Sequence, residues 1–187
     1  MMAPTHVLVG LVLATAVVTV SPELGTAAAL GGVVGGLAPD VDMFVGQHRR
    51  TLHAPVLGFV PAAVLGGVAV ALPRPAPVAV AVSVGLLAAA VHATSDALGG
   101  GRELRPWEQT NRNGVYCHAA GRWLQARYVV PYDGAPRDAL LAAVLAVPVV
   151  RTFDGAVQWL AVGLVAVGGL YALVRKRLPK YVEPIVE

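Results

Sequence analysis

The residues best suited to chemistry in this chain are aspartates and histidines that gather in one short polar stretch. Asp40 and Asp42 follow Pro39, and His48 and His53 come shortly after them. Long runs of alanine, valine, leucine and glycine flank this stretch. Charged groups beside such runs are costly unless they pair, hydrate or bind an ion. Since carboxylate oxygens and imidazole nitrogens are common ligands of divalent metals, we expect the stretch to form part of a metal site.

Residues with the same chemistry lie elsewhere in the chain. His92 and Asp96 are four positions apart in an apolar segment, so they share one helix face. Ionisable residues inside membrane helices are usually functional, although a His–Asp hydrogen bond that only joins two helices would also explain this pair. His6 stands near the start of the first apolar segment, where we expect it at the rim of the site. His118 is the fifth histidine, and we expect it at the membrane interface, outside the site.

The candidate metal ligands are therefore rich in nitrogen and oxygen: His6, Asp40, Asp42, His48, His53, His92 and Asp96. This donor set suits zinc first, and also manganese, iron or nickel. The chain has one cysteine, which excludes an intrachain disulfide and a zinc site built from cysteines. Seven candidates exceed the four ligands of a tetrahedral zinc. Either two ions bind, or some of these residues orient the others.

Two kinds of side chain near the ligands could take part in a reaction. Asp40 or Asp42 could act as general base for an attacking water. The guanidinium of Arg49 matches the oxygens of a phosphate group. Arg49 and its neighbour Arg50 could equally serve only to anchor the topology of the chain in a membrane.

Composition indicates that a bilayer surrounds much of the chain. The 187 residues are 56% hydrophobic and 13% charged, with a mean hydropathy of +0.66, whereas soluble domains carry about 25% charged residues. The sequence pI is about 9.4, but the net charge is only +3. Outside the run at 175–177 there is no dense basic stripe, so we expect no nucleic-acid partner.

Six apolar segments give the predicted elements: 3–20, 23–38, 54–72, 76–98, 139–150 and 155–174. We read the first as a retained helix rather than a signal peptide, because no basic residue precedes it. The second contains two overlapping Gly-x-x-x-Gly patterns between Gly31 and Gly36, which favour close helix packing in membranes. A tight turn is expected at 73–75. The fold class is thus all-α, a multi-pass transmembrane bundle of about six spans.

A polar segment at 99–138 interrupts the apolar ones. It contains Trp107, Trp123 and three tyrosines together with six arginines. Because tryptophan and tyrosine accumulate at membrane interfaces, we expect an interfacial helix over 119–130 and a cap over the site. The chain then divides into a four-span core with the metal site (1–98), the interfacial insert (99–138) and two further spans with a basic tail (139–187).

The distribution of positive charge predicts the orientation. With six spans, two of the 14 lysine and arginine residues, Arg74 and Arg151, fall on one side and the remaining twelve on the other. The richer side should be cytoplasmic, which places both termini in the cytoplasm of a plasma-membrane protein. All seven candidate ligands then lie at one depth on the cytoplasmic side, although the ligands played no part in counting the spans.

These motifs resemble those of a known family. The residues Pro39-Asp40-Val41-Asp42, His48-Arg49-x-Thr51-x-His53 and His92-x-x-x-Asp96, with His6 near the start, are similar to the membrane-bound, metal-dependent hydrolase family. It is also called the LexA-binding, inner-membrane-associated hydrolase family. The resemblance covers about residues 1–100, and the chain departs from it at Leu52-His53-Ala54, where Thr-His-Ser is expected.

The resemblance implies a reaction as well as a site. The family is distantly similar to zinc-dependent phospholipases C and single-strand nucleases, which implies phosphodiester hydrolysis. We expect membrane lipid as a partner and a small-molecule or lipid phosphoester as substrate, because the predicted site sits at the depth of the lipid head groups.

Two other classes of function remain open from the residues alone. The first is a non-catalytic metal-binding or ion-transport membrane protein with His92 and Asp96 on the ion path. The segments of the second half offer no matching polar residues for such a path. The second is a structural membrane protein in which His–Asp contacts only lock helices together.

Overall fold

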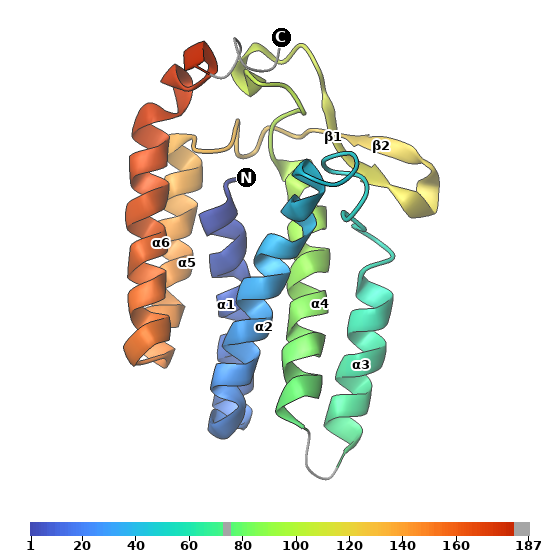
Figure 1. Ribbon diagram of the computed structural model, residues 1–187, viewed down its shortest axis with the longest axis vertical. Helices are drawn as coiled ribbons and strands as arrows, with labels where there is room; N and C mark the ends of the chain where they lie inside the picture. The colour runs from blue at the N-terminus through green and yellow to red at the C-terminus, as the bar shows by residue number, and fades with distance from the viewer. Residues whose placement is uncertain (73–75, 182–187) are drawn as a thin grey trace.

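The apolar segments form long helices that run side by side (Figure 1). The computed structural model describes residues 1–72 and 76–181, so the turn expected at 73–75 lies outside the described residues. Each helix begins or ends close to a proline, glycine or serine that punctuates the sequence. The helices are α1 (Ala3–Val20), α2 (Gly25–Leu37), α3 (Phe59–Ala71), α4 (Pro77–Ser95), α5 (Pro136–Thr152) and α6 (Gly155–Val174).

Four helical stretches are long and apolar enough to cross a membrane: Ala3–Val20, Pro22–Met43, Pro77–Leu98 and Gly155–Arg177. α3 is apolar but has only 13 residues, and α5 carries Arg137, Asp138 and Arg151. The structure is therefore a mostly helical bundle in which four stretches could cross a membrane, whereas the multi-pass arrangement with six spans expected from the sequence stays a prediction.

Glycines set the position of α2 between α1 and α4 (Figure 1). A Cβ on Gly31 would overlap the carbonyl of Ala81 in α4, and one on Gly32 would overlap the carbonyl of Gly10 in α1. The same alternation continues one turn later, where Gly35 faces α4 and Gly36 faces α1. Small residues at this spacing let helix backbones approach closely. The two overlapping Gly-x-x-x-Gly patterns thus serve two different neighbours.

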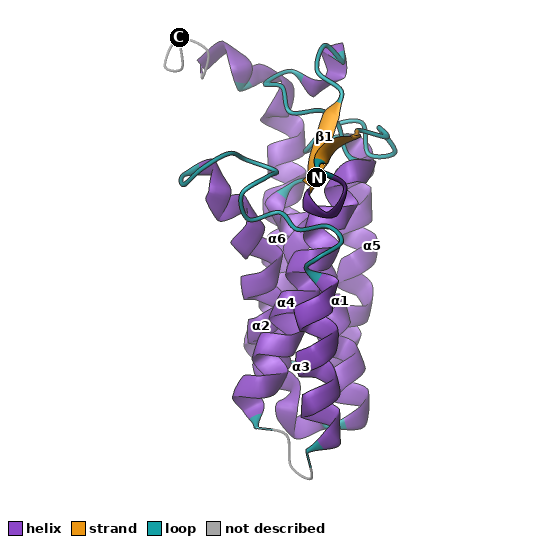
Figure 2. Cartoon of the chain, turned by 90° about the vertical axis from the view of Figure 1, so that its right-hand side faces the viewer, coloured by secondary structure: helices purple, strands orange, loops and turns teal. Residues whose placement is uncertain are grey.

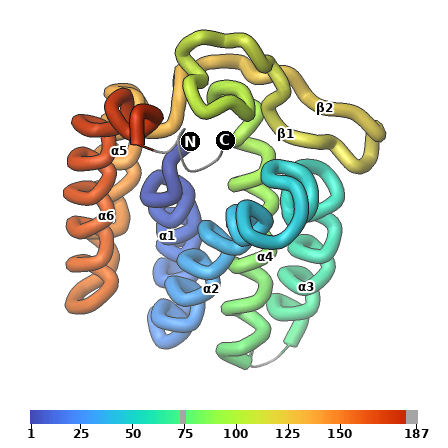
Figure 3. Tube along the Cα trace, turned by 45° about the horizontal axis from the view of Figure 1, so that its top comes forward, coloured from blue at the N-terminus to red at the C-terminus, as the bar shows by residue number. Residues whose placement is uncertain are grey.

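The polar parts of the chain gather at one end of the bundle (Figure 2). The start of α1, the end of α2, the end of α4 and the residues between α2 and α3 all lie there (Figure 3). Contacts between α1 and α5 and between α5 and α6 attach the last two helices to the first four. Every segment that carries a candidate ligand consequently reaches the same end.

The insert differs from the expected interfacial helix over 119–130. It forms an antiparallel hairpin of β1 (Asn113–Cys117) and β2 (Arg122–Gln125), joined by a turn in which Gly121 has a φ of +61°. Tyr116 and Trp123 face each other across the strands, and such aromatic pairs stabilise hairpins. The backbone N–H of Tyr116 donates to the carbonyl of Arg49 at 2.9 Å. This contact holds the hairpin against the polar stretch between α2 and α3.

Candidate metal centre

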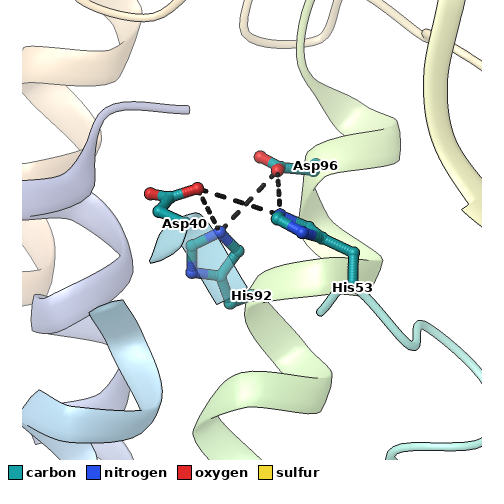
Figure 4. Close-up of side chains that lie close together, drawn as sticks. All are labelled: Asp40, His53, His92 and Asp96. Atoms are coloured by element: carbon teal, nitrogen blue, oxygen red, sulfur yellow. Dashed lines mark ion pairs between the residues drawn. The ribbon is translucent and has the colours of Figure 1, made fainter. Parts of the chain in front are cut away.

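Four of the candidate ligands face one another at the polar end of the bundle (Figure 4). One ligand atom from each of Asp40, His53, His92 and Asp96 lies within 4.8 Å of the other three. His92 Nε2 is 3.3 Å from Asp40 Oδ1, and His53 Nε2 is 3.3 Å from Asp96 Oδ2. Two imidazole nitrogens and two carboxylate oxygens therefore surround one point, and this group could hold a metal ion.

The backbone after α2 separates the two aspartates that the sequence placed together. On an extended segment, the side chains of Asp40 and Asp42 would point the same way, because they are two residues apart. Instead, residues Ala38–Met43 form a 3-10 helix, in which residues two apart do not share a face. The chain therefore does not leave the helical conformation at Pro39 but continues from the α-helix into a 3-10 helix. As a result Asp40 reaches His92, whereas Asp42 turns towards His48 and His53.

Hydrogen bonds fix the orientation of both central imidazoles. His92 Nδ1 lies 2.8 Å from the carbonyl of Gly36, which accepts but cannot donate. His92 Nδ1 must therefore carry the hydrogen, and in the neutral ring Nε2 keeps its lone pair. His53 Nδ1 lies 2.9 Å from Asp42 Oδ2 and donates to it in the same way. Such outer partners are the usual means of aiming a histidine at a metal.

Asp42 is better suited to orienting histidines than to binding an ion itself. It is fully buried and accepts from His53, from His48 Nδ1 at 2.9 Å and from the N–H of Leu52 at 3.3 Å. These three donors occupy most of its lone pairs. Asp42, His48 and His53 form a second group with metal-ligand spacing. A neutral His53 ring, however, cannot offer a lone pair from both nitrogens.

His6 is buried behind the centre, not at its rim as expected. Its side chain is 1% exposed and its ring stacks on His92 with centroids 3.5 Å apart. His6 Nε2 lies 3.1 Å from Asp96 Oδ1, so it holds the oxygen of Asp96 that faces away from the four-residue group. Gly36 allows this position of the His6 ring, because α1 packs so close to α2 that a Cβ on Gly36 would lie 2.8 Å from the carbonyl oxygen of His6.

Arg49 also faces the centre. It adopts a φ of +62°, and its Nη1 donates to the carbonyl of Gly100 at 2.7 Å. Its Nε lies 3.5 Å from Asp96 Oδ2. This guanidinium offsets the negative charge of Asp96 and ties the insert to the centre.

Two buried histidine nitrogens that form no hydrogen bond indicate whether these residues suit a metal. His53 Nε2 and His92 Nε2 are buried and form no hydrogen bond, and leaving a buried polar atom unpaired costs about 1–3 kcal/mol. Both atoms point into the group of four, next to the carboxylates of Asp40 and Asp96. A divalent cation would bind the two lone pairs and balance the two negative charges. The residues present fit such an ion.

The pKa values of His48 and His53, the two histidines between α2 and α3, shift in opposite directions. Burial alone would lower the pKa of His53, but the neighbouring carboxylates of Asp96 and Asp42 outweigh burial and raise this pKa above its ordinary value. For His48, burial and the neighbouring charge of Arg49 outweigh Asp42 and lower the pKa. At neutral pH His48 is therefore an uncharged ring, whereas His53 attracts a positive charge, either a proton or a metal.

A cavity of about 470 Å³ adjoins the centre. Asp40, His48, Arg49 and Asp96 contribute to its wall, and so does Arg102 from the insert. Sequence reasoning missed Arg102 as a site residue, since it lies in an irregular segment and only its place beside the cavity distinguishes it from the other arginines. His118 lies apart, exposed and bonded to the carbonyl of Arg50 at 2.7 Å.

Comparisons of this chain with protein-family models, with curated proteins and with solved structures found no match.

Proposed function

We propose that this chain is a metal-dependent hydrolase embedded in the plasma membrane, which cleaves a phosphoester at the cytoplasmic surface. The observation that carries the proposal is the convergence of His53 Nε2 and His92 Nε2, both buried and unpartnered, on the carboxylates of Asp40 and Asp96. The resemblance to the membrane-bound, metal-dependent hydrolase family supports the same reading. The twelve basic residues predicted on one side support the cytoplasmic location.

His53, His92 and Asp96 are the residues best suited to hold the ion, because each is nearly fully buried and forms a hydrogen bond with a second group. Asp42, Gly36 and His6 supply those second contacts. Two nitrogens and carboxylate oxygens suit zinc, and also manganese or iron. We propose one ion, because the ring nitrogen that a second ion would need donates to Asp42.

Asp40 is the aspartate best suited to act as general base. Its side chain is 23% exposed and lines the cavity, so it can contact a water molecule there, whereas Asp42 is enclosed by its three donors. A bound divalent ion supplies charge stabilisation to a phosphoryl group and lowers the pKa of water towards ~7. Arg49 and Arg102, which line the same cavity, can bind the phosphate oxygens.

Hydrolysis of a chromogenic phosphodiester and phosphomonoester by the detergent-purified chain tests this proposal. We expect turnover that a chelator removes and that zinc or manganese restores. Asp40→Asn should lower kcat by about a hundredfold or more, as loss of a general base does, and should leave metal content close to that of the wild type. Arg122→Ala, at an exposed position of the hairpin outside the cavity wall, is the matched control.

Stoichiometric metal without turnover of any phosphoester would reject the hydrolase and leave a non-catalytic ion-binding protein. Turnover that survives complete removal of metal would reject the role of the ion.

A further inference from the structure

One part of the cavity beside the centre is lined by apolar residues of α1 and α6. Besides Asp40 and Asp96, its wall includes Met2 and Pro4 at the start of α1 and Val167 of α6. Val167 lies seven residues before the end of α6, which is about 10 Å along the helix. The cavity thus joins a charged region at the polar end to an apolar region between two helices.

The apolar region reaches the outer surface of the bundle. Val167 is 57% exposed although it lines the cavity, and α6 as a whole is the least buried of the four candidate spans, at 11%. In a membrane, this surface faces lipid chains. Because Val167 is both exposed on this surface and part of the cavity wall, the cavity reaches the outer surface of α6, where an acyl chain could enter from the hydrocarbon.

The charged region of the cavity wall includes the guanidinium of Arg102. Arg102 stacks over Trp123 at 4.5 Å from the ring centroid and, within the described residues, forms no ion pair. The other two arginines of the wall already have acidic partners, because Arg175 Nε donates to Asp133 at 2.8 Å and Arg49 Nε lies 3.5 Å from Asp96 Oδ2. Arg102 is therefore free to bind an anion, and its planar guanidinium suits phosphate.

We infer that the substrate is a phosphate-bearing lipid whose head group binds at Arg102 and whose acyl chain lies in the slot between α1 and α6. This inference rests on the proposed function, because it names the substrate class of the same site. The volume of about 470 Å³ is within the range of small-molecule sites. A small phosphoester without an acyl chain would bind in the charged region only, and nothing would occupy the apolar slot.

Photo-crosslinking locates the lipid directly. The full chain is placed in nanodiscs of phosphatidylcholine with a phosphatidic acid that carries a diazirine on one acyl chain. A chelator is present so that turnover cannot consume the probe. We expect crosslinks concentrated at the start of α1 and around Val167, at least fivefold above those formed by the matching diacylglycerol probe. Glycerol 3-phosphate at the same concentration should not compete, whereas unlabelled phosphatidic acid should.

Three variants separate the two parts of the slot. Val167→Trp fills its mouth and should lower the specific crosslink at least fivefold, whereas Val162→Trp, at an exposed valine of the same helix outside the cavity wall, should not. Arg102→Ala should remove the advantage of phosphatidic acid over diacylglycerol. Metal content and thermal unfolding, measured on each variant, should match the wild type.

Crosslinks spread evenly over the lipid-facing helices would overturn the inference. So would equal labelling by diacylglycerol, full competition by glycerol 3-phosphate, or an unchanged crosslink in Val167→Trp. A chain that crosslinks as expected but neither binds metal nor hydrolyses phosphoesters would reject the proposed function and leave a phospholipid-binding slot.

Discussion

At the scale of single residues, the site depends on which nitrogen of each histidine is free. Gly36 and Asp42 accept hydrogen bonds from the Nδ1 atoms of His92 and His53, so both Nε2 atoms face the two carboxylates. An unpaired charge in the hydrocarbon costs ~3 kcal/mol by insertion scales, and two carboxylates held together repel each other. One shared cation relieves both costs.

Metal binding at this site should weaken as the pH falls. An imidazole must be neutral to bind an ion. Burial opposes a proton on His53, but Asp96 and Asp42 outweigh it and raise the pKa of His53 above 6.5. Protons therefore compete with the ion at a higher pH than they would for free histidine. Calorimetric titration with Zn²⁺ should show proton release at neutral pH and affinity that falls about tenfold or more from pH 7.5 to 5.5.

The direction in which zinc affinity changes with pH shows whether histidine nitrogens bind the ion. If affinity stays constant over this range, or rises towards low pH, neither His53 nor His92 binds the ion through a ring nitrogen. His118→Ala, which removes an exposed histidine outside the centre, provides the control and should leave the pH profile unchanged.

At the scale of elements, the glycines of α2 determine how closely the ligand-bearing helices approach. A Cβ on Gly36 would lie 2.8 Å from both the carbonyl oxygen of His6 and the Cα of Val7, so Gly36→Ala must push α1 away. We expect a loss of about 1–3 kcal/mol, as for other overpacked positions. We also expect weaker metal binding, since the acceptor of His92 moves with α2. Thermal unfolding in detergent measures the first effect.

Gly163→Ala is the matched change, because a Cβ there meets nothing within 4 Å. It should leave the unfolding temperature unchanged or slightly higher. Equal losses from both substitutions would mean that helix packing at Gly36 does not support the centre.

The bounds of the apolar helices could largely be predicted from sequence, whereas the insert could not. α1 and α6 occupy the predicted ranges 3–20 and 155–174, because strong apolar runs end at serine, proline or glycine. The hairpin of the insert depends on the pairing of Tyr116 with Trp123 and on a bond to Arg49. These are long-range contacts that an aromatic, arginine-rich composition does not specify.

The candidate site was predictable in its membership but not in its roles. From residue type and predicted depth in the membrane we expected seven candidate ligands at one end of the bundle, and the structure brings them together there. The division into central and outer groups follows from the 3-10 helix at Ala38–Met43 and from the stacking of His6 on His92. Neither feature has a local sequence signal, since proline at this position is equally compatible with an extended turn.

At the scale of the whole molecule, we expect a defined orientation in the membrane. The start of α1, the end of α2 and the end of α6 lie at one end of the bundle (Figure 1), which is the end that carries the residues of the centre. A reporter enzyme fused after Leu72 should therefore be active on the external side, and one fused after Lys180 on the cytoplasmic side. Cytoplasmic activity of the Leu72 fusion would reject the six-span arrangement.

Elemental analysis of the purified chain decides whether the buried histidines and aspartates form a metal centre. After loading with zinc and removal of free ions, the wild type and His118→Ala should retain about one ion per chain, the stoichiometry of a single site. His92→Ala and Asp96→Ala should retain less than about a tenth of that, because each removes an atom of the central group. A wild-type chain that retains no ion, or a His92→Ala variant that retains as much as the wild type, would contradict the metal centre.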